Sequence, residues 1–316
     1  MSRAFVFPGQ GAQTVGMGRD LAEAHPAARA VFDEVDEALG ERLSALVWEG
    51  DAETLTLTAN AQPALMATSI ASLRALEAEG VSVREHAACV AGHSLGEYSA
   101  LVAAGALSVA EAARLLRIRG RAMQEAVPPG EGAMAAILGL DLEAVRAVAE
   151  AAAEGEVCEA ANDNDPAQVV ISGSRAAVGR AAALAKERGA KRALMLPVSA
   201  PFHCALMEPA ARAMAEALAS ADLRDPAVPL IANVTGAPVR DAGEIRDLLV
   251  RQVTGAVRWR GSVERMIADG ATEFWEIGAG KALSGMIKRI DKSAATRAVG
   301  TSDEARGAAA SLQGAA

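Results

Sequence analysis

Apolar residues along the chain follow two patterns: short continuous runs, and longer stretches in which they recur every three or four positions. The first pattern predicts buried strands at residues 3–7 (RAFVF) and 87–91 (AACVA). The second predicts helices at 19–39, 60–79, 95–104 and 108–126. Ser108, with Glu111 three positions later, forms a capping box that marks the start of the last of these helices.

The segment that follows Pro128-Pro129-Gly130 has a rhythm of its own. Its apolar runs predict strands at 134–139, 157–162, 168–173 and 191–198, with a polar NDNDP turn before the third. Helical spacing occupies 142–155 and 176–190. The order β-α-β-β-α-β is that of a ferredoxin-like unit. We therefore expect a small subdomain over residues 129–198, inserted into a core built from residues 1–128 and 199–316.

Beyond the insert, strands and helices alternate again. The pattern predicts strands at 229–234 and 273–278, and helices at 206–219, 243–253, 259–269 and 280–290. Such alternation predicts an α/β fold with a mainly parallel sheet. The Ala/Gly-rich tail from Ser302 shows little periodicity, and we expect it to be weakly ordered.

Composition narrows the class of protein. The chain is 51% hydrophobic, but no run reaches the ~18 apolar residues of a membrane-spanning helix, and the N-terminus is too short in apolar residues for a signal peptide. A net charge of −9 disfavours nucleic acid and anionic membranes as partners. Cys89, Cys158 and Cys204 form no CxxC pair, which favours reduced thiols in a cytoplasmic protein. The histidines show no metal-ligand spacing, so we expect no metal site.

Ser94 lies in Gly92-His93-Ser94-Leu95-Gly96, which matches the G-x-S-x-G motif of a nucleophile elbow. A predicted strand precedes the motif and a predicted helix follows it, as the elbow requires. The turn would expose the serine hydroxyl at the helix N-terminus, where the helix dipole and the Leu95 N–H face an oxyanion. We predict that Ser94 is a nucleophile. The alternative is a glycine-flanked turn serine without activity.

A serine nucleophile needs a base. His203 is the preferred candidate, because it lies just before a helix where the chain re-enters the core. By pattern alone, a structural histidine explains His203 equally well. His93 is adjacent to Ser94 and is expected in a supporting role, whereas His25 and His86 have polar neighbours and are expected at the surface.

Two further segments carry candidate binding groups. FPGQGAQ (7–13) is a glycine-rich loop without the third glycine of a dinucleotide motif or the GK[ST] of a phosphate loop, so its N–H groups suit an oxyanion hole better. The helix over 111–126 carries four arginines: Arg114, Arg117, Arg119 and Arg121. One guanidinium pointing inward would bind a carboxylate through two hydrogen bonds, and the pattern does not choose among the four.

Eight segments share one order and spacing with a known family: FPGQGAQ, GHSLGEYSA, RIRGRAMQEAV, NDNDPAQVVISG, PVSAPFHCALM, IANVTG, VRQVTGAVRW and EIGAGKALSGMIKRI. From residue 3 to residue 300 the chain thus resembles the malonyl-CoA:acyl-carrier-protein transacylases of bacterial type II fatty acid synthesis. The resemblance implies an α/β-hydrolase-like core interrupted by a ferredoxin-like insert. Ala279 stands where the family commonly has proline, a departure confined to a turn.

The resemblance also implies roles for single residues. Ser94 matches the nucleophile that becomes malonylated, and His203 matches its general base, oriented by the backbone carbonyl at Gln252. The N–H groups of Gln10 and Leu95 match the oxyanion hole. Arg119 matches the arginine that pairs with the malonyl carboxylate. Phe202, as in malonyl-selecting polyketide acyltransferases, and His93 are expected to line the substrate site.

The implied reaction is a ping-pong transfer of malonyl from malonyl-CoA to the phosphopantetheine thiol of holo-acyl carrier protein, with no cofactor. Burial of a carboxylate without a partner is costly, so a fixed guanidinium favours malonyl over acetyl. The carrier protein is acidic, as is this chain, and docking therefore requires a local basic patch. The candidate patch consists of Lys186, Arg188, Lys191, Arg192, Lys288 and Arg289.

Three alternatives remain open at the level of sequence. A serine acyl hydrolase shares the elbow, but its triad usually has an acidic residue between the serine and the histidine, and Asp163 and Asp165 fall in a predicted turn of the insert. A stand-alone polyketide acyltransferase has nearly the same motifs. A non-catalytic carrier-binding protein would not require Ser94, His203 and Arg119 to be intact.

Overall fold

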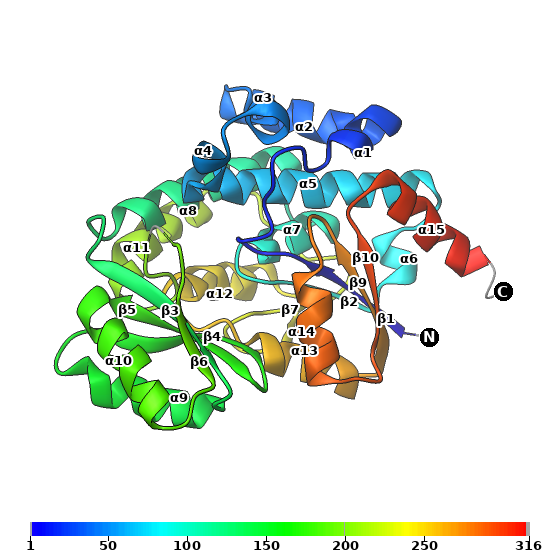
Figure 1. Cartoon of the computed structure of the whole chain (residues 1–316). Helices are drawn as coiled ribbons and strands as arrows, with labels where there is room; N and C mark the ends of the chain where they lie inside the picture. Colours follow the sequence, from blue (N-terminus) through cyan, green and yellow to red (C-terminus); the bar gives the residue numbers. More distant parts are fainter. Residues whose placement is uncertain (1, 199, 314–316) are drawn as a thin grey trace.

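The computed structural model describes residues 2–198 and 200–313, which form two β-sheets with helices packed around them (Figure 1). The larger sheet has the strand order β10-β9-β1-β2-β7-β8. Its strands are β1 (Ser2–Phe7), β2 (Cys89–Gly92), β7 (Leu230–Ile231), β8 (Pro238–Val239), β9 (Ala271–Ile277) and β10 (Ala295–Val299). Every neighbouring pair is parallel except β7 with β8. The prediction of an α/β fold with a mainly parallel sheet is confirmed.

Strand β1 lies in the middle of this sheet and is buried on both faces. Phe5 and Phe7 point into one hydrophobic cluster, where Phe5 stacks on Trp275 with ring centroids 5.4 Å apart. Ala4 and Val6 point into a second cluster on the opposite face. A strand that is covered on both faces needs apolar side chains at consecutive positions, which explains the continuous apolar run in RAFVF.

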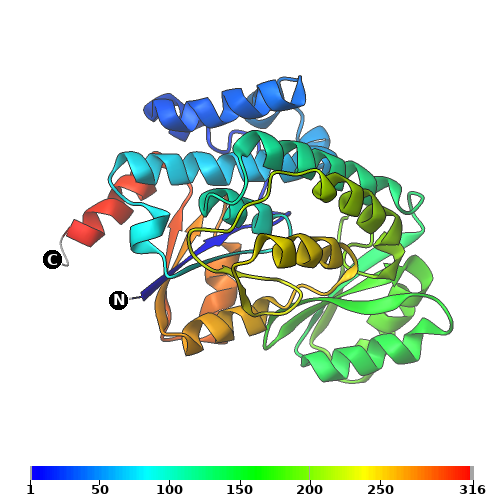
Figure 2. The same ribbon diagram turned by 180° about the vertical axis from the view of Figure 1, so that it is seen from behind.

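Helices cover both faces of the larger sheet (Figures 1 and 2). On one face lie α5 (Thr58–Ala78), α7 (Gly96–Ala103) and α8 (Val109–Glu125), and on the other α13 (Trp259–Ala268) and α14 (Ala282–Ile290). The remaining helices of the larger part are α1 (Arg19–Ala24), α2 (Pro26–Leu39), α3 (Leu43–Glu49), α4 (Ala52–Thr56), α6 (Val83–His86), α11 (Glu208–Ala219), α12 (Ala242–Thr254) and α15 (Ser302–Gln313). Ser108 is confirmed as the N-cap of α8, because its side chain accepts the Glu111 N–H.

The smaller sheet is antiparallel, with the strand order β4-β5-β3-β6. Its elements in chain order are β3 (Gly132–Leu138), α9 (Leu142–Ala153), β4 (Cys158–Asp165), β5 (Gln168–Ser174), α10 (Arg175–Glu187) and β6 (Arg192–Met195). This is the predicted β-α-β-β-α-β order. The subdomain limits, 129–198 within 1–128 and 199–316, stay a prediction, and residue 199 lies outside the described residues.

The predicted polar turn NDNDP is wrong, because β4 continues through it as far as Asp165. The pairing of β4 with β5 shifts register between Ala160 and Asn162 and again between Asp163 and Asp165. These irregularities let the strand hold polar residues whose partners lie in the larger part of the protein. Asp163, for example, donates its N–H to the Val257 carbonyl (2.9 Å).

Three more expectations fail. The helix predicted over 19–39 is broken at His25, because Pro26 begins a new helix and its ring disfavours helical backbone at the residue before it. His25 is not at the surface: it is buried, with Nε2 2.9 Å from Ser302 Oγ. Over residues 302–313 the tail is not weakly ordered, since it forms α15 and buries alanines at helical spacing (Ala305, Ala308 and Ala309); residues 314–316 lie outside the described residues.

The smaller sheet is joined to the larger part of the protein by an isolated parallel bridge between Asn162 and Val257. The Val257 N–H donates to the Ala161 carbonyl (2.9 Å), so the edge of the smaller sheet is joined directly to the segment between α12 and α13. Within residues 2–198 and 200–313, no helix combines the length and the hydropathy that crossing a bilayer requires.

Candidate active site

Ser94 occupies a sharp turn between β2 and α7, with φ at 53°. This left-handed backbone is uncommon for a residue other than glycine and marks a strained position, as at nucleophile elbows. The turn is possible only because its flanks lack side chains. A Cβ on Gly92 would lie 1.9 Å from the Gly96 backbone, and one on Gly96 would lie 2.3 Å from the Phe7 carbonyl oxygen. Both glycines of the motif are therefore required by close backbone approach.

His203 is buried beside this serine, although it is far away in the sequence. Its Nε2 lies 2.8 Å from Ser94 Oγ, and its Nδ1 lies 2.9 Å from the Gln252 carbonyl oxygen. A carbonyl can only accept, so Nδ1 carries the proton and Nε2 is free to accept the Ser94 hydroxyl proton. Burial and the nearby Arg119 guanidinium lower the pKa of His203 to about 3, which keeps the imidazole neutral near pH 7.

Arg119 is the arginine of α8 that points into the site. Its side chain is buried, and Nη2 lies 3.1 Å from Ser94 Oγ. The same guanidinium donates to Gln62 Oε1 (2.8 Å) and to Gln252 Oε1 (2.7 Å). Arg114 and Arg121 are exposed, while Arg117 is buried but bonds to Glu41 and Asn60.

The close packing of α8 on α5 places Arg119. At Gly120, a Cβ would lie 2.6 Å from the Thr58 carbonyl oxygen, so only glycine permits this approach. The contact fixes the rotation of α8 about its own axis and turns Arg119, the preceding residue, toward the elbow.

The glycine-rich loop after β1 packs against the elbow. A Cβ on Gly9 would meet the His93 carbonyl oxygen at 2.6 Å. The loop is closed by the Gly11 N–H, which donates to Gln13 Oε1 (2.7 Å). Among the described residues, the backbone N–H groups of Gln10 and Leu95 have no hydrogen-bond acceptor. Both groups are thus available to a ligand, as an oxyanion hole requires.

Sequence reasoning missed two residues that hold the elbow, Glu97 and Asn233. Asn233 Oδ1 accepts the Ser94 N–H (2.8 Å), and its Nδ2 donates to the Gly92 carbonyl (2.7 Å). Glu97 is buried in the first turn of α7, and burial raises its pKa to about 7. The sequence offered a signal for Glu97: it is the one charged residue in the segment GEYSALVA, and a buried carboxylate needs hydrogen-bond partners.

The remaining predicted site residues lie around this centre. His93 is half-buried, with Nε2 2.9 Å from Asn164 Oδ1 on β4, so it connects the elbow to the smaller sheet. Phe202 is buried next to His203. His86 is half-buried and bonds to Ser82, away from these residues.

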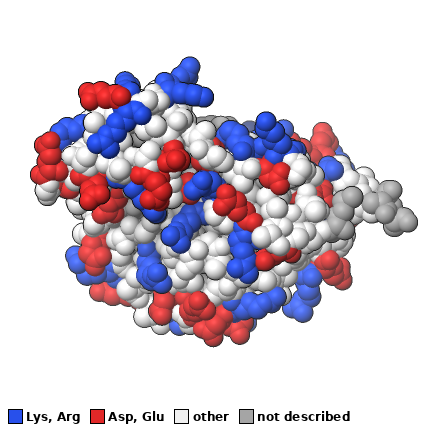
Figure 3. Space-filling model, turned by 90° about the horizontal axis from the view of Figure 1, so that it is seen from below, with Lys and Arg blue, Asp and Glu red and all other residues white. Residues whose placement is uncertain are grey.

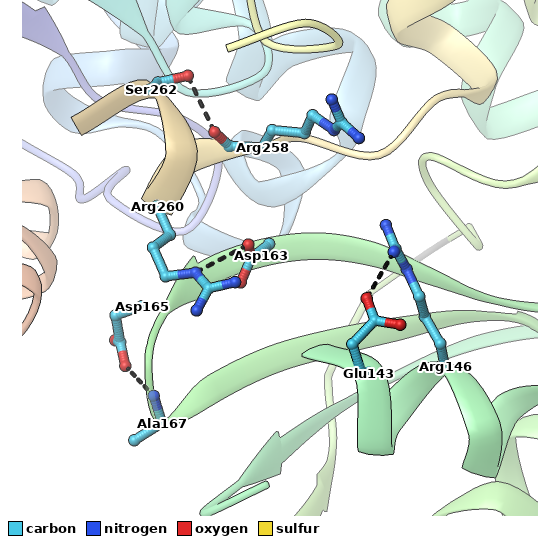
Figure 4. Close-up of polar contacts among 8 residues, drawn as sticks. All are labelled: Glu143, Arg146, Asp163, Asp165, Ala167, Arg258, Arg260 and Ser262. Carbon is cyan, nitrogen blue, oxygen red and sulfur yellow. Dashed lines mark hydrogen bonds and ion pairs between the residues drawn. The ribbon is translucent and has the colours of Figure 1, made fainter. Parts of the chain in front are cut away.

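The two carboxylates weighed for a hydrolase triad point elsewhere. Asp163 accepts from Arg260 (3.0 Å), and Asp165 accepts from the Ala167 N–H (2.9 Å; Figure 4). Asp165 also pairs with Arg289 (2.8 Å). The contact that His203 Nδ1 makes is instead with a backbone carbonyl, so this geometry lacks the acidic third member of a hydrolase triad.

An elbow serine that is hydrogen-bonded to a histidine, on an α/β fold, is an arrangement that serine acyltransferases share with serine hydrolases, and comparisons with known proteins place this chain with the acyltransferases. In agreement, residues 4–304 match the acyl transferase domain family. The chain is 51% identical over 297 residues to the malonyl CoA-acyl carrier protein transacylase of Bacillus subtilis, covering 94% of this chain and 92% of the relative. Identity to the Escherichia coli K12 protein of the same name is 50% over 287 residues, covering 91% and 92%. The chain belongs to the malonyl CoA-acyl carrier protein transacylase family.

Solved structures agree with this assignment. The acyl-carrier-protein S-malonyltransferase of Bartonella henselae superposes with a TM-score of 0.97 at 54% identity, covering 99% of this chain and all of that one. A malonyl-transacylase in complex with a type II polyketide acyl-carrier protein superposes with a TM-score of 0.95 at 43% identity, covering 98% and 100%.

Proposed function

We propose that this protein transfers the malonyl group from malonyl-CoA to the phosphopantetheine thiol of an acyl carrier protein, through a malonyl ester on Ser94. One observation carries the proposal. The Ser94 hydroxyl lies within hydrogen-bond distance both of the His203 imidazole (2.8 Å) and of a buried guanidinium, that of Arg119 (3.1 Å). The first group activates the serine, and the second is placed to receive a carboxylate on the acyl group.

In the first half-reaction, Ser94 Oγ attacks the thioester carbonyl of malonyl-CoA while its proton passes to His203 Nε2. The Gln252 carbonyl accepts the Nδ1–H and stabilises the imidazolium that forms. The developing oxyanion is bound by the N–H groups of Gln10 and Leu95. The C–S bond then breaks, and the CoA sulfur leaves with the proton that His203 received.

In the second half-reaction, the carrier thiol takes the place of CoA. His203 accepts the thiol proton, the sulfur attacks the malonyl ester, and the C–O bond to Ser94 breaks. The serine oxygen recovers the proton from His203. In both half-reactions the proton passes through His203. The reactants are malonyl-CoA and the carrier.

Arg119 supplies the preference for malonyl. Its guanidinium is fixed by Gln62 and Gln252, so it is already oriented before substrate binds. A malonyl carboxylate gains a charge-assisted bidentate partner there, whereas an acetyl group leaves the guanidinium without an added acceptor.

Intact mass spectrometry tests the proposed function. Incubation with malonyl-CoA is expected to add one malonyl group to the wild-type protein and none to Ser94→Ala. Ser99→Ala is the matched control: this serine lies on α7, the helix that follows the elbow, is fully buried and has no hydrogen-bond partner for its hydroxyl among the described residues. It is expected to be labelled like the wild type.

The fate of the adduct separates transferase from hydrolase. On addition of holo-acyl carrier protein, the malonyl group is expected on the carrier, with little free malonate. Mainly free malonate would show a hydrolase. An unlabelled wild-type protein would refute the malonyl-serine intermediate altogether.

The basic residues named above are proposed to dock the acidic carrier. All six are exposed: Lys186, Arg188, Lys191, Arg192, Lys288 and Arg289. Leu194 and Met195, each 47% exposed, extend the same edge strand with apolar surface. Acidic and basic side chains are interspersed on the face seen in Figure 3, so docking depends on local charge.

Reversing two of these charges, Lys191→Glu with Arg192→Glu, is expected to raise the KM for the carrier about tenfold at low salt, because like charges then meet at the interface. The KM for malonyl-CoA should stay constant. Arg84→Glu on α6, at the other end of the molecule from α10 (Figure 1), is the control. An unchanged KM for the carrier would place the docking surface elsewhere.

A further inference from the structure

Glu97 is a buried carboxylate that the proposed reaction does not use. It is 1% exposed, and its two oxygens face different neighbours. Oε2 accepts from Gln252 Nε2 (2.5 Å), and Oε1 accepts from the Asn233 backbone N–H (3.2 Å). The carboxylate thus lies beneath the elbow, in contact with residues that hold Ser94 and Arg119.

The carboxylate determines which way the Gln252 side chain faces. An ionised carboxylate only accepts hydrogen bonds, and a guanidinium only donates them. Gln252 lies between the two, donating through Nε2 to Glu97 and accepting through Oε1 from Arg119 Nη2 (2.7 Å). Reversal of the carboxamide would set its NH₂ group against the guanidinium and its oxygen against the carboxylate. Together with the Ser94 carbonyl, which accepts from the same Nε2 (2.9 Å), Glu97 therefore favours one orientation of this carboxamide.

The interposed amide also keeps the guanidinium open to substrate. A direct ion pair between Glu97 and Arg119 would occupy the donors that a substrate carboxylate needs. With Gln252 between them, the carboxylate balances the buried positive charge while Arg119 Nη2 still reaches Ser94 Oγ.

We propose that Glu97 is a positioning residue for acyl-group selection: through Gln252, it holds the Arg119 guanidinium in the orientation that receives the substrate carboxylate. The proposal rests on the malonyl transfer proposed above. Its specific consequence is that loss of the Glu97 charge weakens discrimination between malonyl and acetyl, although Glu97 contacts neither Ser94 Oγ nor Arg119 through any hydrogen bond among the described residues.

The test compares kcat/KM for malonyl-CoA and acetyl-CoA in Glu97→Gln. The malonyl value is expected to fall about 10- to 100-fold, the scale for misplacing a binding group by about 1 Å. The acetyl value should change by less than about threefold, because acetyl does not use the guanidinium. Glu276→Gln is the matched control: this buried carboxylate accepts backbone N–H groups at the start of α14, and its removal should leave the malonyl-to-acetyl ratio unchanged.

The double variant Glu97→Gln/Arg119→Ala separates positioning from a general structural role. If Glu97 acts through Arg119, adding Glu97→Gln to Arg119→Ala changes the ratio by less than about threefold, because the two effects share one cause. A merely structural residue would lower both kcat/KM values in both backgrounds. An unchanged ratio in Glu97→Gln, or additive effects in the double variant, would overturn the proposal.

Gln252→Met tests the same proposal, because Gln252 lies between Glu97 and Arg119. This variant can be used even if Glu97→Gln does not fold. It removes the three side-chain bonds, to Glu97, Arg119 and the Ser94 carbonyl, and retains the backbone carbonyl that orients His203. The same loss of malonyl preference is expected, and an unchanged preference would count against the positioning role. Failure of the proposed function is distinguishable, because then the wild-type protein itself would form no malonyl adduct.

Discussion

Arg119→Ala is expected to change the protein from malonyl-selective to acetyl-tolerant. The guanidinium is 1% exposed and fixed on two sides, so a substrate carboxylate in the variant would be buried without a partner. Removing one partner of a buried charge pair costs about 2–5 kcal/mol, which corresponds to a fall in kcat/KM for malonyl-CoA of about 30- to 4,000-fold. Competition between malonyl-CoA and acetyl-CoA, read by the mass of the adduct, measures the change.

The control for this prediction is Arg121→Ala, on the same helix but exposed. It should leave the malonyl-to-acetyl ratio at its wild-type value. If Arg119→Ala lowers both activities equally, the guanidinium supports the elbow and does not select the acyl group. A ratio of acetyl to malonyl adducts equal to that of the wild type would also show that the guanidinium does not select the acyl group.

His203→Ala should slow formation of the malonyl-serine about 10²- to 10⁴-fold, the usual contribution of a general base. His203 Nε2 lies 2.8 Å from Ser94 Oγ and can accept its proton. Among the described residues, the other side chain bonded to this hydroxyl is Arg119, which is cationic and cannot accept a proton. Single-turnover labelling with malonyl-CoA gives the rate. His86→Ala, which alters a half-buried histidine outside the site, should label at the wild-type rate.

The same histidine predicts the pH dependence of acylation. Its pKa is lowered to about 3, so the neutral base persists well below the usual value of about 6.5. For acetyl-CoA, which does not use the guanidinium that Glu97 positions, kcat/KM should therefore show no tenfold fall per pH unit as the pH drops from 7 to 5. The free energy of unfolding depends on pH in the same direction. Because the pKa of His203 is lower in the folded than in the unfolded protein, its contribution to this free energy is fully present above about pH 6.5 and is lost as the pH falls toward 3. A rate that halves near pH 6.5 would show an unperturbed base.

Local pattern was sufficient for the parts of the site that are local in sequence. The elbow is read from Gly92 and Gly96 because the close contacts that demand glycine are made within that turn and with the adjoining strand. His203 could not be chosen by pattern, since its meeting with Ser94 depends on a left-handed backbone (φ 59°) and on the Gln252 carbonyl from a third segment. Family resemblance supplied what spacing did not.

Arg119 shows the limit of helical periodicity. The spacing of the four arginines is compatible with several rotations of α8, and the rotation is fixed by backbone contact at Gly120 with a helix some sixty residues earlier. The C-terminal helix shows the opposite limit. Its apolar face consists of alanines, which bury well but raise hydropathy little, so a real amphipathic helix resembled an unstructured tail.

Gln252 gives this architecture a consequence for engineering. Its main-chain carbonyl accepts from His203 Nδ1, and its side chain accepts from Arg119 and donates to the Ser94 carbonyl (2.9 Å). One position therefore contacts both the proposed base and the proposed acyl-selecting arginine. A library that varies this side chain to admit new extender units would keep the main-chain carbonyl but would remove the contacts to Arg119 and to the Ser94 carbonyl together. Gln62 contacts the same guanidinium without touching the base, which makes it the safer position at which to retune the pocket.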